Sequence, residues 1–210
     1  MKKKKTIIAA LILLLLLIIG GTVAYFTDTD DKTNTFTLGN VKIKLVEDAY
    51  DEAVAAGETT DILPGVAVAK DPAVKNEGNN AAFVFVEVEV DCVANEPLFT
   101  YDVKDGWTKL KEVKTCDPDE KQTVLYYYGA GDELTELGKG ETSTTLFDEV
   151  TLDKDLTTAA VASLESTEQK INVKAYGIQS KGLAAPVNPE TVWANFNGNS
   201  GSAVCVGGNC

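Results

Sequence analysis

The segment from Ala82 to Cys92 constrains the fold more than any other part of the chain, because its residues alternate between two faces. Alternation with a period of two indicates a β-strand. One face would carry Val84, Val86, Val88, Val90 and Cys92, and the other Phe83, Phe85, Glu87, Glu89 and Asp91. Because carboxylates are rarely buried without partners, the acids predict a second face that is solvated along its later half.

Several shorter runs extend this interpretation to the rest of the chain. Strand-like patterns occupy Val41–Leu45, Thr123–Gly129, Ser143–Leu152 and Lys170–Ile178, with turn signals at Ile62–Gly65 and Lys75–Asn80. Helical patterns occupy Leu156–Glu165 and Glu190–Phe196, and the second begins with an Asn188 cap followed by Pro189. The acidic, Ala-rich residues Glu47–Asp61 would form either a loop or a short helix. Many short strands with few helices predict an all-β fold, a jelly-roll-like antiparallel β-sandwich with one or two short helices.

The first residues have the pattern of an export signal. Lys2–Lys5 precede an apolar run, Ile7–Ile19, and small residues follow it. The run is 13 residues long, which is too short to cross ~30 Å of hydrocarbon comfortably. We expect cleavage between Ala24 and Tyr25, secretion of the protein, and contact with the membrane only through the uncleaved signal.

Four regions follow from these patterns. Residues 1–24 are the expected signal peptide, and residues 25–40 a flexible N-terminal segment rich in Asp and Thr. Residues 41–196 would form the β-sandwich, and residues 197–210 a tail rich in Gly, Asn and Ser.

Charge and composition exclude several classes of function. The formal net charge is −13, and loss of the four lysines Lys2–Lys5 lowers it by four, to −17. Such a protein will not seek nucleic acid or an anionic membrane by electrostatics. Histidine is absent, which excludes an H-E-x-x-H zinc site and any Ser-His or Cys-His dyad. We therefore predict no catalytic, cofactor-binding or metal-binding residues and no enzyme, although a carboxylate pair remains open in principle.

Four cysteines remain after export: Cys92, Cys116, Cys205 and Cys210. An even number in an exported chain suggests disulfides, and four cysteines allow three pairings. The local pairing would join Cys92 to Cys116 and Cys205 to Cys210. The alternative is free thiols in an anaerobe.

Two further segments invite a binding function. The run Tyr126–Tyr128 would suit a glycan platform, but an ordinary strand, in which alternate tyrosines face core and solvent, accounts for it without a ligand. The segment Asp28–Asp31 would suit calcium, yet it lacks the Gly and the terminal Glu of an EF-hand loop. A polar leader accounts for it without a ligand.

Several segments together resemble a known family. Residues 20–28, Gly-Gly-Thr-Val-Ala-Tyr-Phe-Thr-Asp, resemble the exit of signal peptides cut by the SipW-type signal peptidase of Gram-positive bacteria. Residues 34–45 resemble the first block of the TasA/camelysin family, and Leu63-Pro64-Gly65 and Asn76-Glu77-Gly78 resemble later blocks. Residues 171–179 resemble its closing strand. The resemblance covers residues 10–90 and 145–196, and leaves residues 92–141 and the tail after Phe196 unmatched.

The resemblance implies a secreted structural protein, a subunit of an extracellular fibre or biofilm matrix. Its partners would be further copies of the chain, a SipW-type signal peptidase and other matrix proteins. Family fibres are said to assemble by donor-strand exchange, in which one subunit's N-terminal segment completes a sheet of the next. The candidate anchors are Tyr25, Phe26, Phe36 and Leu38; alternatively, this segment is only a leader to the strand at Val41. A competing hypothesis is a monomeric cell-surface adhesin or module that binds glycan or calcium. Some relatives carry a metalloprotease label, which the lack of histidine contradicts.

Overall fold

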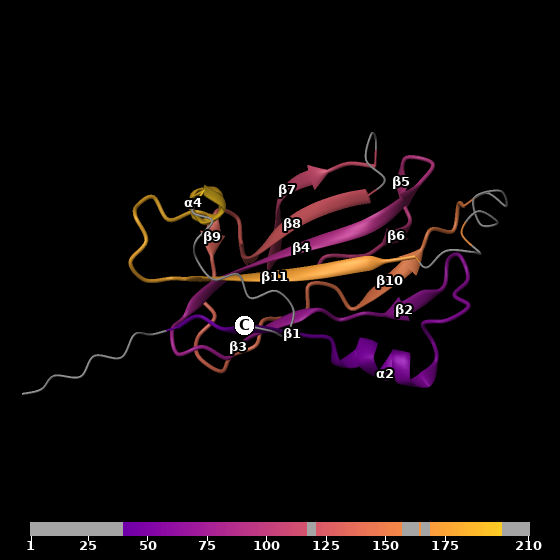
Figure 1. Cartoon of the computed structure of the whole chain (residues 1–210), viewed down its shortest axis with the longest axis horizontal. Coiled ribbons are helices and arrows are strands. Elements are labelled where there is room, and N and C mark those ends of the chain that lie inside the picture. The colour runs from indigo at the N-terminus through magenta and orange to yellow at the C-terminus, as the bar shows by residue number, and fades with distance from the viewer. Residues whose placement is uncertain (1–39, 117–120, 157–163, 165–168, 199–210) are drawn as a thin grey trace, which may run out of the picture. The chain divides into compact units, whose positions relative to one another are not determined.

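The computed structural model describes residues 40–116, 121–156, 164 and 169–198, all within the compact unit Gly39–Cys210 (Figure 1). The strands are β1 (Ile43–Val46), β2 (Ala67–Ala69), β3 (Ala73–Asn76), β4 (Ala82–Val93), β5 (Glu96–Pro97), β6 (Phe99–Thr100), β7 (Trp107–Lys114), β8 (Lys121–Ala130), β9 (Glu133–Leu134), β10 (Glu149–Leu152) and β11 (Ile171–Gln179). The helices are α2 (Asp48–Ala56) and α4 (Pro189–Gly198). Every strand pairing in the described residues is antiparallel, which confirms the all-β fold.

The larger sheet has the order β11-β4-β8-β7. Its centre is β4, the strand predicted from the alternation at Ala82–Cys92. β4 pairs with β11 from Ala82↔Gln179 to Val90↔Ile171, and with β8 from Phe85↔Tyr127 to Asp91↔Lys121. A long strand of β-branched residues with partners on both sides therefore organises this layer.

The second layer consists of two small sheets. One has the order β2-β10-β6, and the other pairs β1 with β3. An isolated bridge joins Lys75 of β3 to Thr142. The main core lies between the two layers. Its buried residues are Ile43, Val74, Val84, Val86, Val88, Val90, Leu98, Phe99, Trp107, Val124, Tyr126, Leu137, Leu146, Phe147, Val150, Leu152 and Ala175.

A second cluster covers the outer face of the larger sheet. Helix α4 places Val192 and Trp193 on Phe83 and Phe85 of β4 and on residues of the neighbouring strands. Asn188 caps α4, because its Oδ1 accepts the Thr191 N–H at 2.9 Å. The first half of β4 is therefore buried on both faces. The later half of its outer face is charged, as predicted.

One segment differs from the sequence-based expectations, and one predicted helix lies mostly outside the described residues. Lys75 and Asn76, predicted as part of a turn, belong to strand β3, and the turn begins after them. Asn76 has no exposed surface, and its side chain bonds only to backbone, so a typical turn residue here completes a strand. The predicted helix Leu156–Glu165 lies outside the described residues, apart from Leu156 and Leu164.

Candidate functional site

Many of the residues singled out by sequence lie outside the described residues. These are the cleavage pair Ala24 and Tyr25, the anchors Phe26, Phe36 and Leu38, the segment Asp28–Asp31, and Cys205 with Cys210. The first residue that the structure describes is Asn40, which follows the candidate donor residues Tyr25–Leu38. The candidate site therefore comprises the point where that segment joins the domain and the strand edges.

A turn at Asn76–Asn80 holds the root of the N-terminal segment. The N–H groups of Glu77 and Gly78 both donate to the Lys42 carbonyl oxygen, at 2.7 and 2.9 Å. The N–H of Asn79 donates to the Asn40 carbonyl oxygen at 3.1 Å. The chain leading into β1 is thus fixed by backbone hydrogen bonds. Side chains add an ion pair between Lys42 Nζ and Glu77 Oε2 at 2.9 Å and hydrogen bonds from Asn79 to Asn40 Oδ1.

The buried side chain of Asn76 shapes this turn. Its Nδ2 donates to the carbonyl oxygens of Asn80 and Leu137, both at 2.8 Å. Its Oδ1 accepts the Gly78 N–H at 2.9 Å. With these bonds the burial of a polar amide has no uncompensated cost.

Gly78 is needed because the backbones approach closely. A Cβ at this position would lie 2.6 Å from the Lys42 nitrogen and 2.7 Å from the Asn40 carbonyl oxygen. Neither neighbour is a flexible side chain, so any larger residue must displace the backbone. The Asn76-Glu77-Gly78 motif therefore has a physical role, namely to hold the start of β1.

The edge of β11 is the most regular strand edge in the described part of the chain. β11 pairs with β4 over its full length without a bulge, and has no strand partner on its other side among the described residues. On the inner face of the sheet, Gly177 lies against the side chains of Ile43 and Val41, because an added Cβ would lie 2.7 Å from Ile43 Cγ2 and 3.0 Å from Val41 Cγ1.

A pocket of about 260 Å³ lies at the Ile171 end of this edge. Apolar side chains from both layers line it, among them Ile62, Val68, Phe99, Val150 and Ile171. Polar side chains line the rest, namely Thr59, Gln169, Lys170 and Asn172 together with Lys70 and Tyr50. This volume suits one large side chain or a small ligand.

Lys70 is a buried cation in the wall of the pocket. Its Nζ lies 2.8 Å from Glu47 Oε1 and 4.0 Å from the centre of the Tyr50 ring. An unpaired buried ammonium is costly, so the ion pair and the ring make its burial tolerable. The sequence analysis did not identify this residue. The feature that could have indicated its burial is its position directly after the apolar run Val66–Ala69.

Asp71 positions Tyr50 in the pocket wall. Its carboxylate oxygens accept the N–H groups of Ala49 and Tyr50 at 3.0 and 3.1 Å. These are orphan donors in the first turn of α2, where Glu47 makes no side-chain cap. Asp71 therefore caps α2 from a distant part of the chain and ties the helix to the β2–β3 connection.

The edge at β7, in contrast to that of β11, is irregular and lined with lysines. Its pairing with β8 is interrupted by irregularities between Lys109 and Lys111 and between Glu112 and Lys114. Lys109, Lys111 and Lys114 are all exposed. Bulges and lysines are the usual devices that keep an edge strand from pairing with another chain.

Two of the three residues in the tyrosine run, Tyr126 and Tyr127, are buried, and Tyr128 is partly buried, so the run forms no exposed platform. Tyr126 and Tyr127 are 5% and 3% exposed, and they belong to the clusters on opposite faces of the sheet. The Tyr126 hydroxyl lies 3.1 Å from that of Tyr101. Burial raises the pKa of both phenols. The run is therefore part of a strand, as expected, but Tyr127 faces the cluster under α4 and not solvent, because that helix covers the outer face.

Ion pairs hold the charged half of the outer face. Lys121 Nζ lies 2.7 Å from Glu89 Oε1 and 3.7 Å from Asp91 Oδ1. The hydrogen bond from Lys121 is the main reason that the pKa of Glu89 falls below its ordinary value. Its counterpart is a raised pKa of Lys121, chiefly through the same bond.

Cys92 and Cys116 form a disulfide that joins the end of β4 to the chain after β7. Their Cα atoms are 5.6 Å apart. Strand β8 lies between β4 and β7 in the sheet, so the bridge connects two strands that are not neighbours. Both thiols are thereby unavailable as metal ligands.

The described residues do not offer the donor set of a peptidase metal centre. The whole chain lacks histidine, and no group of three or more Cys, Asp or Glu side chains in the described ranges is arranged to hold a metal ion. Zinc peptidases use His with carboxylate ligands. Within the same ranges, no helix is long and apolar enough to span a membrane.

One comparison with known proteins gives a match. Residues 1–96 match a family model described as camelysin metallo-endopeptidase. The matched part includes β1, α2, β2, β3 and β4, and therefore the Asn76–Gly78 turn, Lys70 and Asp71. No curated protein matches the chain.

Proposed function

Through residues 1–96 the chain belongs to the TasA/camelysin family, and from this premise we propose that it is a secreted structural subunit of an extracellular fibre or biofilm matrix. A SipW-type signal peptidase would cut after Ala24 and release an N-terminus at Tyr25. The new N-terminal segment would then add as a strand to the sandwich of a second copy.

The main support for this proposal is the unpaired edge of β11. It is long and free of bulges, and it has no strand partner on its outer side among the described residues. Strand addition satisfies the backbone N–H and C=O groups of such an edge, and alternate side chains of the donor fill pockets. The contrast with the blunted edge at β7 favours β11 as the acceptor.

The pocket at the Ile171 end suits one anchor of the donor. A volume of about 260 Å³ is enough for a single Phe, Tyr or Leu side chain. Phe36 and Leu38 are separated by one residue, so in a strand both point to the same side. Residues 25–39 can extend over about 50 Å, which is enough to reach a neighbouring subunit.

The anchored root at Asn40–Lys42 supports the same mechanism. A segment that inserts into a neighbouring subunit is helped by a fixed attachment to its own domain, because a mobile attachment would lose more conformational entropy when the segment becomes ordered. The hydrogen bonds from Glu77, Gly78 and Asn79 supply that point.

The family description names an endopeptidase, and this activity is not part of the proposal. A chain without histidine cannot form the usual zinc site or a His-based nucleophilic dyad. The adhesin alternative loses its glycan platform, because Tyr126 and Tyr127 are buried.

Negative-stain microscopy of purified protein that starts at Tyr25 tests the proposal. We expect filaments from this protein and none from a version that starts at Gly39, whose retained fold is checked by circular dichroism. Filaments of the same form from the shorter protein would refute the donor role. A monodisperse monomer from both would refute the fibre role and leave the adhesin hypothesis.

Matched substitutions separate the side chains from the backbone of the donor. Phe36→Ser with Leu38→Ser removes both anchors on one side of the strand. Thr35→Ser with Thr37→Ser changes the alternate positions and serves as the control. We expect the first pair to abolish filaments and the second to preserve them; equal behaviour of the two pairs would contradict pocket filling.

A further inference from the structure

β7 presents a basic, partly apolar surface, which we call the basic edge. It consists of Lys109, Lys111 and Lys114 with Val113, which is 46% exposed. The single acid on this strand is Glu112, which lies 3.5 Å from Lys109. The basic edge therefore keeps an excess of positive charge on a chain whose net charge is strongly negative.

The segment around α2 presents the opposite surface, which we call the acidic patch. Its exposed acids are Asp48, Asp51, Glu52, Glu58 and Asp61. No lysine occurs between Lys44 and Lys70. Lys70 is buried against Glu47, and within the described ranges no ion pair is formed by the five exposed acids.

Both surfaces also expose large apolar side chains. The acidic patch includes Val54, Leu63 and Val66, which are 48%, 66% and 49% exposed. Together with Val113 they make up four of the six exposed large hydrophobic residues found in the described part of the chain. Apolar groups inside a rim of charge are typical of a surface that another macromolecule covers.

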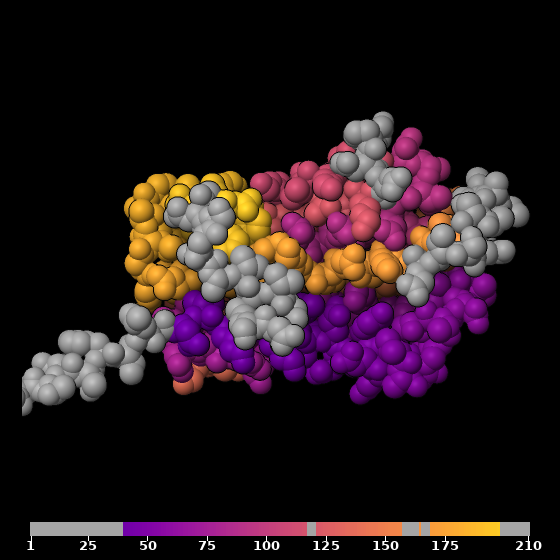
Figure 2. All heavy atoms as spheres, in the orientation of Figure 1, coloured from indigo at the N-terminus to yellow at the C-terminus, as the bar shows by residue number. Residues whose placement is uncertain are grey.

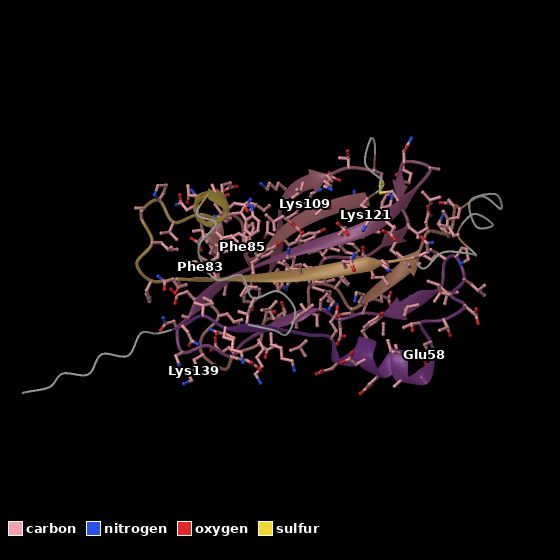
Figure 3. The ribbon with its side chains drawn as sticks, in the orientation of Figure 1. Glu58, Phe83, Phe85, Lys109, Lys121 and Lys139 are labelled. Carbon is pink, nitrogen blue, oxygen red and sulfur yellow. A yellow bond between two sulfur atoms is a disulfide. The ribbon has the colours of Figure 1, made fainter. Side chains whose placement is uncertain are left out.

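One copy cannot bring the two surfaces together. β7 and α2 lie on opposite sides of the described domain, as Lys109 and Glu58 show in Figure 3, and Figure 2 shows the α2 segment, in purple, forming the surface on the side away from β7. The two are comparable in length, because nine helical residues span about 13 Å and the strand from Lys109 to Lys114 about 17 Å.

From this complementarity we infer that the basic edge of one copy docks on the acidic patch of the next. The contact joins two different surfaces, so its repetition generates an open chain of copies and not a closed dimer. Bulges and lysines prevent strand pairing at β7, so the contact is made by side chains. The inference deepens the proposed function, since it names a second contact in the same fibre.

Salt dependence gives the first test. Charges at an interface are screened beyond about 8 Å at physiological ionic strength. We expect the critical concentration for assembly of the protein starting at Tyr25, measured by sedimentation, to rise about tenfold between 50 and 500 mM NaCl. A critical concentration that does not change with salt would overturn the inference.

Charge reversal gives the sharper test. Lys109→Glu with Lys111→Glu reverses the basic edge at its two lysines that are farthest in sequence from the acidic residues 117–120. Glu52→Lys with Glu58→Lys reverses the acidic patch near the C-terminal end of α2, where a cation suits the helix dipole. We expect either pair alone to raise the critical concentration at least tenfold, and an equimolar mixture of the two proteins to restore it, because each reversed surface then meets its complement.

A control pair changes the net charge equally at other sites. Lys139→Glu with Lys181→Glu replaces two exposed lysines that lie outside both surfaces, and we expect its critical concentration to change less than twofold. Equal effects of the control and the basic-edge pair would overturn the inference, since only net charge would then matter.

The outcomes separate this inference from the proposed function. Filament assembly that requires residues 25–38, but whose critical concentration changes neither with salt nor with charge reversal, would overturn the docking contact and leave the fibre role standing. Failure of the mixture to restore assembly would also overturn the docking contact. A wild-type protein that stays monomeric at every salt concentration would refute both proposals.

Discussion

Replacement of Gly78 by alanine tests whether the Asn76–Asn80 turn holds the root of the N-terminal segment. The added Cβ would lie 2.6 Å from the Lys42 nitrogen and 2.7 Å from the Asn40 carbonyl oxygen. Both atoms belong to the backbone, so the two segments must separate. That movement breaks the hydrogen bonds that Glu77, Gly78 and Asn79 donate to Lys42 and Asn40.

The magnitude follows from these three bonds. Each backbone hydrogen bond contributes about 0.5–1.5 kcal/mol net, and alanine returns about 0.4–1 kcal/mol by restricting the unfolded chain. We therefore expect Gly78→Ala to lower the free energy of unfolding by about 2–3 kcal/mol. For a domain of this size that corresponds to a fall in Tm of roughly 4–12 °C.

Urea denaturation followed by tryptophan fluorescence measures the loss. Gly131→Ala is the control, because no atom lies within 4 Å of the added Cβ and only the φ of +62° opposes it, at about 1–2 kcal/mol. A loss in Gly78→Ala no larger than that in Gly131→Ala would refute the role assigned to the close approach. We also expect Gly78→Ala to slow filament formation.

Three further predictions concern the sheet and its outer face. Because the pKa of Glu89 is lowered, its ion pair with Lys121 stabilises the fold fully above about pH 4.3, and this stabilisation is lost as the pH falls through the lowered pKa. Glu89→Gln should therefore lower the free energy of unfolding by less than about 1 kcal/mol at pH 7 and by nothing at the acid end of a series of urea titrations. A loss of stability that is constant across pH would contradict this. Loss of the disulfide in Cys92→Ser with Cys116→Ser should lower the free energy of unfolding by about 3 kcal/mol, since the bridge spans 24 residues; an unchanged urea midpoint would show that it does not constrain the unfolded chain. Trp193→Ala should cost about 3–5 kcal/mol, whereas Trp193→Phe should cost much less, because the buried indole N–H has no hydrogen-bond partner among the described residues; equal thermal shifts would contradict the assigned packing role.

Periodicity was sufficient to predict the strands that form the larger sheet. The alternation at Ala82–Cys92 and at Lys170–Ile178 corresponds to β4 and β11, and the β-rich run at Thr123–Gly129 to β8. The Asn188-Pro189 signal predicted the start of α4. These signals are local, since pleat geometry and capping act over a few residues.

The features of the candidate site were not accessible in this way. In the sequence, Lys70 is a lysine at the end of a short apolar run. Its burial depends on Glu47, which lies 23 residues earlier in the chain, and on Tyr50. Asp71 caps α2 from outside the helix. Asn76 reads as a turn residue, yet its side chain bonds to Leu137, 61 residues later. Pairings of this kind follow from topology and leave no periodic trace.

The sequence by itself determined the class of fold, the acidic charge, the exclusion of histidine chemistry and the family resemblance. These depend on composition, on local alternation and on short motifs that need no knowledge of distant contacts. The tertiary structure alone decided that Gly78 is a point of contact with Asn40 and Lys42, and that the edges of β11 and β7 differ. It also decided that lysines and acids gather on two separate surfaces. The physical reason is that strand order and register, which no local pattern specifies, determine which side chains and backbone groups meet and which remain open to a partner.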